Sequence, residues 1–284
     1  MAVRRIGIIG AGIMGRGIAQ VAALGGFETV LQDVDAAQLQ RARDTIDKSM
    51  RKAVEIGKLA ADAVEPALQR IQTCTDLADV AGQAQLVIEA VPERIHLKIE
   101  VLAELDRLCA PETYLATNTS SLSVTEMAAV TQRAPQVVGM HFFNPVPRMR
   151  LLEIVRALET SDAAIELARE VGARMGKETV IVRESPGFIT SRVNALIGNE
   201  AFRMLEEGVA NATDIDKALK LGLNHPMGPF ELVDLVGLDT RLSILEYLHR
   251  TLGDRFRPSP LLVQYVKAGR LGRKTGRGVH DHSS

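Results

Sequence analysis

The 284-residue chain has little cysteine, no long apolar run and almost no net charge. Its two cysteines, Cys74 and Cys109, are too few for a disulfide framework or a zinc site of their own, and they suit a reducing compartment. Lysine and arginine (34) balance aspartate and glutamate (35), which argues against nucleic acid as the main partner. No stretch approaches the roughly 20 apolar residues of a membrane helix. We therefore expect a soluble protein with no membrane partner.

The amino terminus resembles an export signal only superficially. Arg4 and Arg5 precede the apolar stretch 6–14, but glycines interrupt that stretch and Arg16 ends it, with no small-residue cleavage site nearby. We expect a cytoplasmic protein.

A glycine-rich turn follows the first predicted strand. The β-rich run 5–10 leads into Gly10-Ala-Gly12-Ile13-Met14-Gly15, and residues 16–24 have helical character. In a dinucleotide site the first glycine permits the tight turn, the second lets a pyrophosphate approach the backbone, and the third lets the helix pack against the strand. The N-terminus of the helix then faces the phosphates. This spacing indicates a dinucleotide site.

Asp33 indicates which dinucleotide is bound. It follows a second predicted strand, residues 28–32. A carboxylate at this point accepts hydrogen bonds from the adenosine ribose and repels a 2′-phosphate, which favours NAD over NADP. An ordinary turn aspartate is the alternative.

The rest of the first half alternates between strands and helices. Residues 36–68 read as a helical hairpin broken near Gly57, and its basic face either meets a polyanionic ligand or is simply solvated. Further strands are predicted at 86–90, 114–117, 137–140, 152–155 and 179–182, with helices at 95–109 and 163–175. This alternation predicts an α/β fold, a Rossmann-type dinucleotide-binding domain with a helical-hairpin insertion.

Ser185-Pro186-Gly187 marks the expected domain boundary, between residues 1–185 and 186–284. The periodicity beyond it is helical only, so we expect an all-α C-terminal domain with helices at 188–205, from a capping box at Thr213–Asp216 to Gly222, and within 230–252. Its apolar residues outnumber what a small bundle buries, which favours a homodimer. The basic segment 267–277 suggests either an anion-binding patch or a flexible tail.

One histidine and one glutamate suggest acid–base chemistry. His141 is expected just after the strand 137–140, and Glu153 follows twelve residues later inside an apolar run. A buried carboxylate needs a partner. If the two strands are neighbours, Glu153 can orient His141 as a general base, with Ser120 and Asn144 as donors to a substrate oxygen. The alternative is a purely structural histidine.

Several segments in the same order resemble the L-3-hydroxyacyl-CoA dehydrogenase family over essentially the whole chain, most closely its bacterial 3-hydroxybutyryl-CoA members. They are residues 10–15, 87–93, 117–121, 141–147, 186–188, 225–230 and 272–278. The resemblance implies reversible, NAD-dependent oxidation of (S)-3-hydroxyacyl-CoA to 3-oxoacyl-CoA, with short acyl chains favoured. It also implies a place in fatty-acid β-oxidation and a dimer through the helical domain.

The resemblance implies a role for each matching residue. His141 is the catalytic base and Glu153 its partner, with Ser120 and Asn144 at the substrate oxygen and the nicotinamide. The implied cofactor-binding residues are Gly10, Gly12, Ile13, Met14, Gly15, Asp33, Glu93, Lys98, Ser120, Asn144 and Lys274. The implied substrate-binding residues are Ser49, Lys52, Ser120 and Ser191, and no metal is implied.

This chain departs from the family pattern at three places. Ser191 stands where many relatives have asparagine, and Ile56 where a lysine contacts CoA, so Lys52 or Lys58 is expected to substitute. His280 and His282 replace an aromatic terminus.

Two rival functions remain: a 3-hydroxyacid dehydrogenase acting on free acids, and a non-catalytic NADH-binding protein like the lens crystallins of related sequence.

Overall fold

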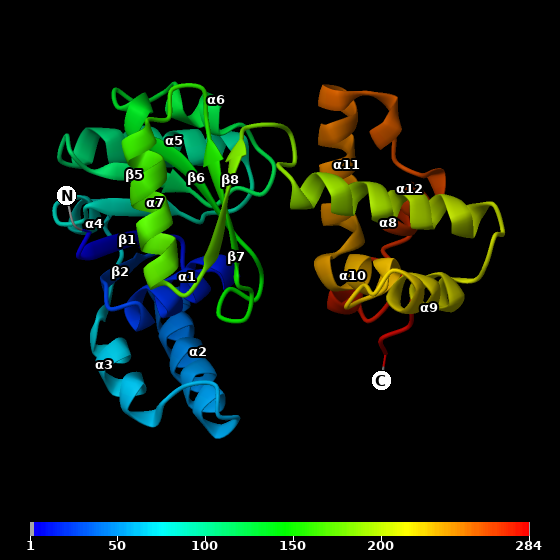
Figure 1. Cartoon of the computed structure of the whole chain (residues 1–284), viewed down its shortest axis with the longest axis horizontal. Coiled ribbons are helices and arrows are strands. Elements are labelled where there is room, and N and C mark those ends of the chain that lie inside the picture. The colour runs from blue at the N-terminus through cyan, green and yellow to red at the C-terminus, as the bar shows by residue number, and fades with distance from the viewer. Residues whose placement is uncertain (1–2, 284) are drawn as a thin grey trace. The chain divides into compact units, whose positions relative to one another are not determined.

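The computed structural model describes residues 3–283, and the chain divides into two compact units, one ending at Ser185 and one beginning at Pro186 (Figure 1). The first unit is built on an eight-stranded sheet with the strand order β3-β2-β1-β4-β5-β6-β7-β8. The strands are Arg5–Ile9 (β1), Glu28–Gln32 (β2), Ile71–Cys74 (β3), Leu86–Glu89 (β4), Tyr114–Thr117 (β5), Val137–Phe142 (β6), Leu151–Arg156 (β7) and Glu178–Arg183 (β8).

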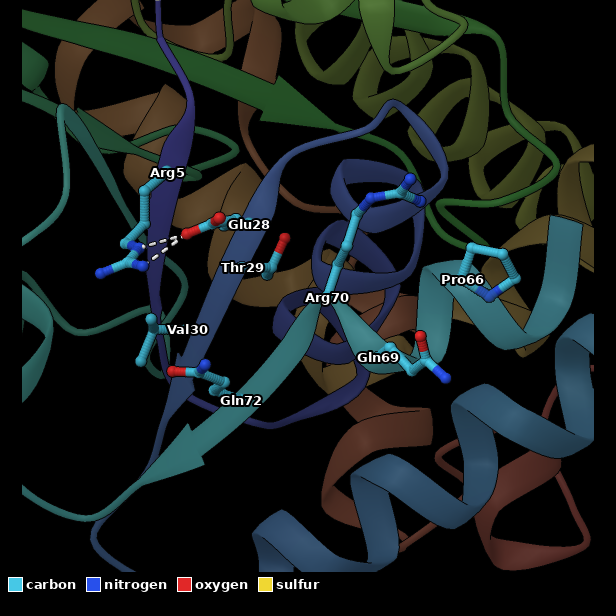
Figure 2. A pocket seen from close by; sticks show the side chains of 8 residues that line it. All are labelled: Arg5, Glu28, Thr29, Val30, Pro66, Gln69, Arg70 and Gln72. Carbon is cyan, nitrogen blue, oxygen red and sulfur yellow. Dashed lines mark hydrogen bonds and ion pairs between the residues drawn. The ribbon is translucent and has the colours of Figure 1, made fainter.

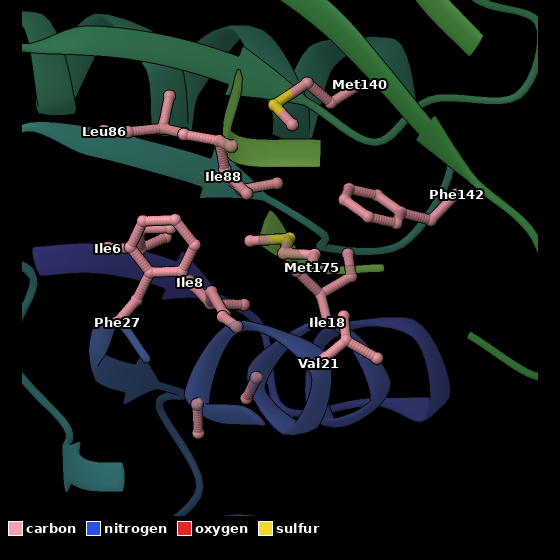
Figure 3. Close-up of a cluster of buried hydrophobic side chains, with 14 of the residues drawn as sticks. Ile6, Ile8, Ile18, Val21, Phe27, Leu86, Ile88, Met140, Phe142 and Met175 are labelled. Carbon is pink, nitrogen blue, oxygen red and sulfur yellow. The ribbon is translucent and has the colours of Figure 1, made fainter. Parts of the chain in front are cut away.

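Helices cover both faces of this sheet. They are Ile13–Leu24 (α1), Ala36–Glu55 (α2), Val64–Gln69 (α3), Leu77–Ala81 (α4), Ile95–Leu108 (α5), Val124–Ala128 (α6) and Asp162–Arg174 (α7), with 3₁₀ turns at Ala61–Ala63 and Ala134–Gln136. Figure 3 shows Ile8, Ile88 and Met140, from β1, β4 and β6, pointing toward Ile18 and Val21 of α1. On the opposite face the backbone of β1 lies against α4. The predicted α/β class, with its helical hairpin, is confirmed.

The directions of the strands determine where the candidate catalytic residues His141 and Glu153 lie. Strands β1 to β6 run parallel, whereas β7 is antiparallel to β6 and parallel to β8. Because β6 extends to Phe142, the expectation that His141 follows the strand is wrong; His141 is paired inside it, opposite Glu153. Strand β3 was not predicted, because only Ile71 is buried there and no apolar run marks it.

The second unit is helical, as predicted. Its helices are Thr190–Glu206 (α8), Ala212–Gly222 (α9), Pro229–Val236 (α10), Leu238–Leu252 (α11) and Pro260–Lys267 (α12), with 3₁₀ turns at Asp254–Phe256 and Arg273–Thr275. Phe202, Phe230 and Phe256 are fully buried in its core. The predicted capping box at Thr213 is wrong. Helix α9 already starts at Ala212, and the side chain of Asn211 accepts the N–H of Asp214.

The carboxy-terminal segment packs onto the second unit, where Lys274 donates to Asp239 and Arg270 to the carbonyl of Gly278. The buried carboxylate of Asp234 accepts the backbone N–H groups of Val279 and His280 and contacts the ring of His282 at 2.8 Å. The ring of His280 lies 2.7 Å from the buried Asp216 carboxylate. Each histidine is thus held by its own carboxylate. Within residues 3–283, no three histidine, cysteine or acidic side chains form a group that could hold a metal ion.

Candidate active site

The turn between β1 and α1 requires glycine at two positions. Gly10 has a φ of 95°, and a Cβ at Gly15 would lie 1.7 Å from the carbonyl oxygen of Gly10. The first backbone hydrogen bond of the helix runs from Arg16 to Gly12, so the N–H groups before Arg16 have no acceptor within the helix. A Cβ at Gly12 would meet nothing within 4 Å. The turn therefore offers backbone donors beside open space.

Asp33 braces this turn from the end of β2. Its carboxylate accepts the backbone N–H of Ala11 at 2.8 Å and that of Asp35 at 3.1 Å. The sequence indicated a ligand-binding carboxylate here but not this second task. Because Asp33 fixes Ala11 inside the glycine turn, its position and that of the turn are set together.

His141 and Glu153 form the buried pair at the centre of the site. They lie opposite each other on β6 and β7, and Nδ1 of His141 is 2.7 Å from the Glu153 carboxylate. Glu153 is fully buried and His141 is 6% exposed. The contact expected from the two strands is present. Since Glu153 occupies Nδ1, Nε2 is the ring nitrogen through which a proton can be exchanged with a substrate.

A polar network links the ends of β4 and β5. The carboxylate of Glu93 accepts the Ser120 backbone N–H at 2.8 Å and the Ser120 hydroxyl at 3.1 Å. Lys98 is fully buried, and its ammonium donates to Glu89 at 2.7 and 3.0 Å and lies 3.3 Å from Glu93. The structure therefore places Lys98 between the buried Glu89 carboxylate and Glu93, the carboxylate that positions Ser120.

Sequence reasoning missed Glu89 in this network, whereas Asn118, directly after the predicted strand 114–117, is among the polar residues that it indicates as site candidates. Glu89 is fully buried and also accepts the Thr117 hydroxyl at 2.6 Å. Asn118 accepts the backbone N–H of Phe142, next to His141, at 2.9 Å. Both come from strand ends that the sequence did identify, but neither partner can be known before the sheet order is known.

The helical hairpin and the segment after His141 enclose a pocket of about 750 Å³. The predicted residues Ser49 and Lys52 line it, as do Ile56 and Lys58. The basic residues along its wall are Lys48, Lys52, Lys58, Arg148, Arg150, Arg174 and Lys177, and none of the side chains lining it from the described chain is acidic. This excess of positive charge, with apolar residues such as Ile56 beside it, suits a polyanionic ligand that also has apolar parts.

Comparison with known proteins places the chain in a family. The model of the 3-hydroxyacyl-CoA dehydrogenase NAD-binding domain matches residues 5–185, and the model of the C-terminal domain of 3-hydroxyacyl-CoA dehydrogenase matches residues 187–282. The chain belongs to the 3-hydroxyacyl-CoA dehydrogenase family. The resemblance carried by the sequence motifs is thereby confirmed, and so is NAD as the cofactor of the first unit.

Similar proteins cover the full length of this family member. The 3-hydroxybutyryl-CoA dehydrogenase of Bradyrhizobium diazoefficiens is 45% identical over 99% of this chain and 96% of its own. The probable 3-hydroxybutyryl-CoA dehydrogenase of Bacillus subtilis is 46% identical over 99% of this chain and 98% of its own. The crystal structure of (S)-3-hydroxybutyryl-CoA dehydrogenase from Ralstonia eutropha has a TM-score of 0.95 at 42% identity, covering 100% of both chains.

The remaining predicted site residues lie at different places in this family member. Asn144 is exposed just after β6, while Ile13 and Met14 open α1. Ser191 is the second residue of α8 in the second unit. Lys274, also in the second unit, binds both carboxylate oxygens of Asp239 at 2.6 Å, so its charge is already paired there.

A second, smaller pocket of about 320 Å³ lies at the amino-terminal ends of the strands (Figure 2). Arg5 and Glu28, the first residues of β1 and β2, line it and form an ion pair with each other. Ligands of parallel sheets bind at the carboxyl ends of the strands, and this is the amino edge. The pocket is therefore no candidate for the reaction.

Neither cysteine is a candidate nucleophile. Burial raises the pKa of both the Cys74 and the Cys109 thiols to about 11, so neither is a nucleophile near neutral pH. In the part of the chain that the structure describes, no helix combines the length and apolarity needed to cross a bilayer.

Proposed function

We propose that this protein oxidises (S)-3-hydroxybutyryl-CoA and related short-chain 3-hydroxyacyl-CoA to 3-oxoacyl-CoA, reversibly and with NAD. The observation that carries the proposal is the buried pair of His141 and Glu153, 2.7 Å apart, in a sheet whose first turn is built for a dinucleotide. Family membership supplies the reaction class. The paired imidazole supplies the general base that alcohol oxidation needs.

The residues of the first turn fit the cofactor. The N-terminus of α1 offers backbone N–H groups and the positive end of its dipole to a pyrophosphate. Ile13 is 59% exposed directly at that turn, which suits a side chain that a bound ligand covers. When bound, NAD⁺ accepts a hydride from the carbon that bears the substrate hydroxyl.

The buried pair handles the proton of the same step. Nε2 of His141 takes the hydroxyl proton as the carbonyl forms, and returns it in the reverse direction. The Glu153 carboxylate stabilises the imidazolium and fixes the ring orientation. Ser120 and Asn144 donate hydrogen bonds to the substrate oxygen, where charge develops. Glu93 keeps Ser120 in place through the Ser120 backbone N–H, while the Ser120 hydroxyl exchanges its hydrogen bond to Glu93 for one to the substrate oxygen.

The 750 Å³ pocket is the proposed site for the CoA portion. Ser49, Lys52 and Lys58 line it from the helical hairpin, and its basic wall complements phosphate groups. Ile56 supplies an apolar contact where the family resemblance implies a lysine. Lys52 is paired with Glu55 at 2.7 Å, so Lys58 has the less compensated charge of the two.

The decisive assay follows NADH absorbance with acetoacetyl-CoA and with free acetoacetate. We expect NADH oxidation with the thioester and a kcat/KM at least about 100-fold lower with the free acid, because free acetoacetate has no CoA portion to bind in the pocket. Comparable rates with free acetoacetate would favour a hydroxyacid dehydrogenase. NADH binding without turnover of either compound would favour a non-catalytic protein.

Asp33→Ala is expected to narrow the preference for NADH over NADPH by about tenfold or more. The substitution removes the charge that repels a 2′-phosphate and the acceptor for the ribose hydroxyls. The ratio of kcat/KM for the two cofactors measures the effect, and Asp33→Asn separates charge from hydrogen bonding to Ala11. An unchanged ratio in both variants would exclude contact between Asp33 and the ribose.

We also propose a cytoplasmic homodimer, formed through the second unit, that acts in fatty-acid β-oxidation. Val209, Leu221 and Leu223 in the second unit are each at least 64% exposed, and burial against a second copy would remove these apolar side chains from water. Two free thiols suit a reducing compartment. Light scattering of the purified protein should give twice the 30.8 kDa chain mass.

A further inference from the structure

Lys177 is a buried cation that neither the motifs nor the mechanism above uses. It is 8% exposed, and its ammonium donates to the carbonyl oxygens of Val146 at 2.5 Å and Met149 at 2.8 Å. No carboxylate of the described chain forms an ion pair with it, and burial lowers its pKa. Burying an ammonium group is costly, so a site that keeps one has a use for its donors.

The backbone around Lys177 is fixed by the end of α7. Gly176 has a φ of 73°, its N–H binds the carbonyl of Ala173, and the N–H of Lys177 binds that of Gly172. These are the two hydrogen bonds of a Schellman motif, which ends a helix in one defined geometry. The Lys177 side chain therefore starts from a rigid base.

The two carbonyls that Lys177 binds belong to the segment between the catalytic strands. Residues 143–150 leave β6 just after His141 and return to β7 just before Glu153, and they include Asn144. Two other hydrogen bonds of this segment are internal, from the N–H groups of Arg148 and Met149 to the carbonyl of Pro145, and at its end the Arg150 carbonyl accepts the N–H of Glu178. Lys177 ties the middle of the segment to the body of the fold.

The same lysine also faces the basic pocket. It lines that pocket together with Arg148 and Met149, and only two of its three N–H donors bind the carbonyls above. An anionic ligand in the pocket would offset the desolvation of the buried ammonium. Lys177 thus lines the proposed CoA site and also binds the segment that carries Asn144.

We propose that Lys177 is a positioning residue for the reaction, which holds residues 143–150, and with them Asn144, in the geometry that the substrate oxygen requires. This inference rests on the proposed function. A misplacement of about 1 Å is enough to cost roughly 100-fold in rate. The effect of losing Lys177 should therefore fall on kcat rather than on cofactor binding.

The test compares Lys177→Met, Lys177→Arg and Lys177→Gln with the wild type on two substrates. The substrates are acetoacetyl-CoA and the acetoacetyl thioester of N-acetylcysteamine, which lacks the nucleotide. We expect Lys177→Met to lower kcat about 10- to 100-fold on both, with the NADH dissociation constant within about twofold of wild type. Lys177→Arg should restore most of kcat, because a guanidinium can still donate to both carbonyls.

Lys217→Met is the matched control, because Lys217 is an exposed lysine of α9 that does not line the pocket. It should leave kcat and KM unchanged on both thioesters. Wild-type kcat in Lys177→Met, or a defect confined to KM for acetoacetyl-CoA, would overturn the inference. If Lys177→Met does not fold, Lys177→Gln decides by the same two criteria. Inactivity of the wild type on both thioesters would overturn the proposed function as well.

Discussion

Replacing His141 with alanine is expected to lower kcat by at least about 100-fold, while NADH affinity changes little. The imidazole is a buried base paired with a buried carboxylate, and loss of an acid–base group costs about 10²- to 10⁴-fold. NADH binding should persist because the glycine turn and Asp33 lie at the ends of β1 and β2, whereas His141 lies in β6. Steady-state NADH oxidation with acetoacetyl-CoA and NADH fluorescence titration measure the two quantities.

His249→Ala is the matched control for this substitution. His249 lies in the second unit, where its ring contacts Asp254 at 3.0 Å. We expect its kcat to equal that of the wild type. If His141→Ala turned over at a near wild-type rate, His141 would not be the base. The intact pair would then serve packing, and the alternative of a structural histidine would stand.

The strands and turns that were predicted correctly are those whose residue pattern is contained in one short stretch of sequence. Strands β2 and β5 have the predicted bounds, because each is a short run of strand-favouring residues, Glu-Thr-Val-Leu-Gln and Tyr-Leu-Ala-Thr, that is buried after its first residue. The glycine spacing gave the turn before α1. The edge strand β3 was missed, since a strand with one buried residue carries no such pattern.

Contacts between distant segments were harder to predict. Glu153 was expected beside His141 only on the condition that their strands are neighbours, and the antiparallel pairing of β6 and β7 meets it. Nothing in the sequence around Lys98 or Lys177 shows that their ammonium groups are buried, because Glu89 and the Val146 carbonyl reach them only in the folded chain. The partners of His280 and His282 were unpredicted for the same reason.

Replacing Glu153 should have the second largest effect, and two substitutions separate its two tasks. Glu153→Gln keeps the size of the side chain and, through its amide oxygen, an acceptor for Nδ1–H, but removes the charge that stabilises the imidazolium. Glu153→Ala removes both and leaves a void beside the ring. We expect kcat to fall about 10- to 100-fold in the first variant and by at least about 100-fold in the second.

Stability should separate the same two variants. Because Glu153 is fully buried, Glu153→Ala leaves the buried Nδ1 of His141 without its acceptor, which costs about 1–3 kcal/mol, whereas Glu153→Gln should stay closer to wild type. Glu28→Gln, on the exposed start of β2, is the control for the loss of one carboxylate charge. Urea unfolding and kcat measured on the same preparations test both expectations. Equal kcat in Glu153→Gln and the wild type would show that the carboxylate charge plays no part in proton transfer, and that Glu153 only orients the ring.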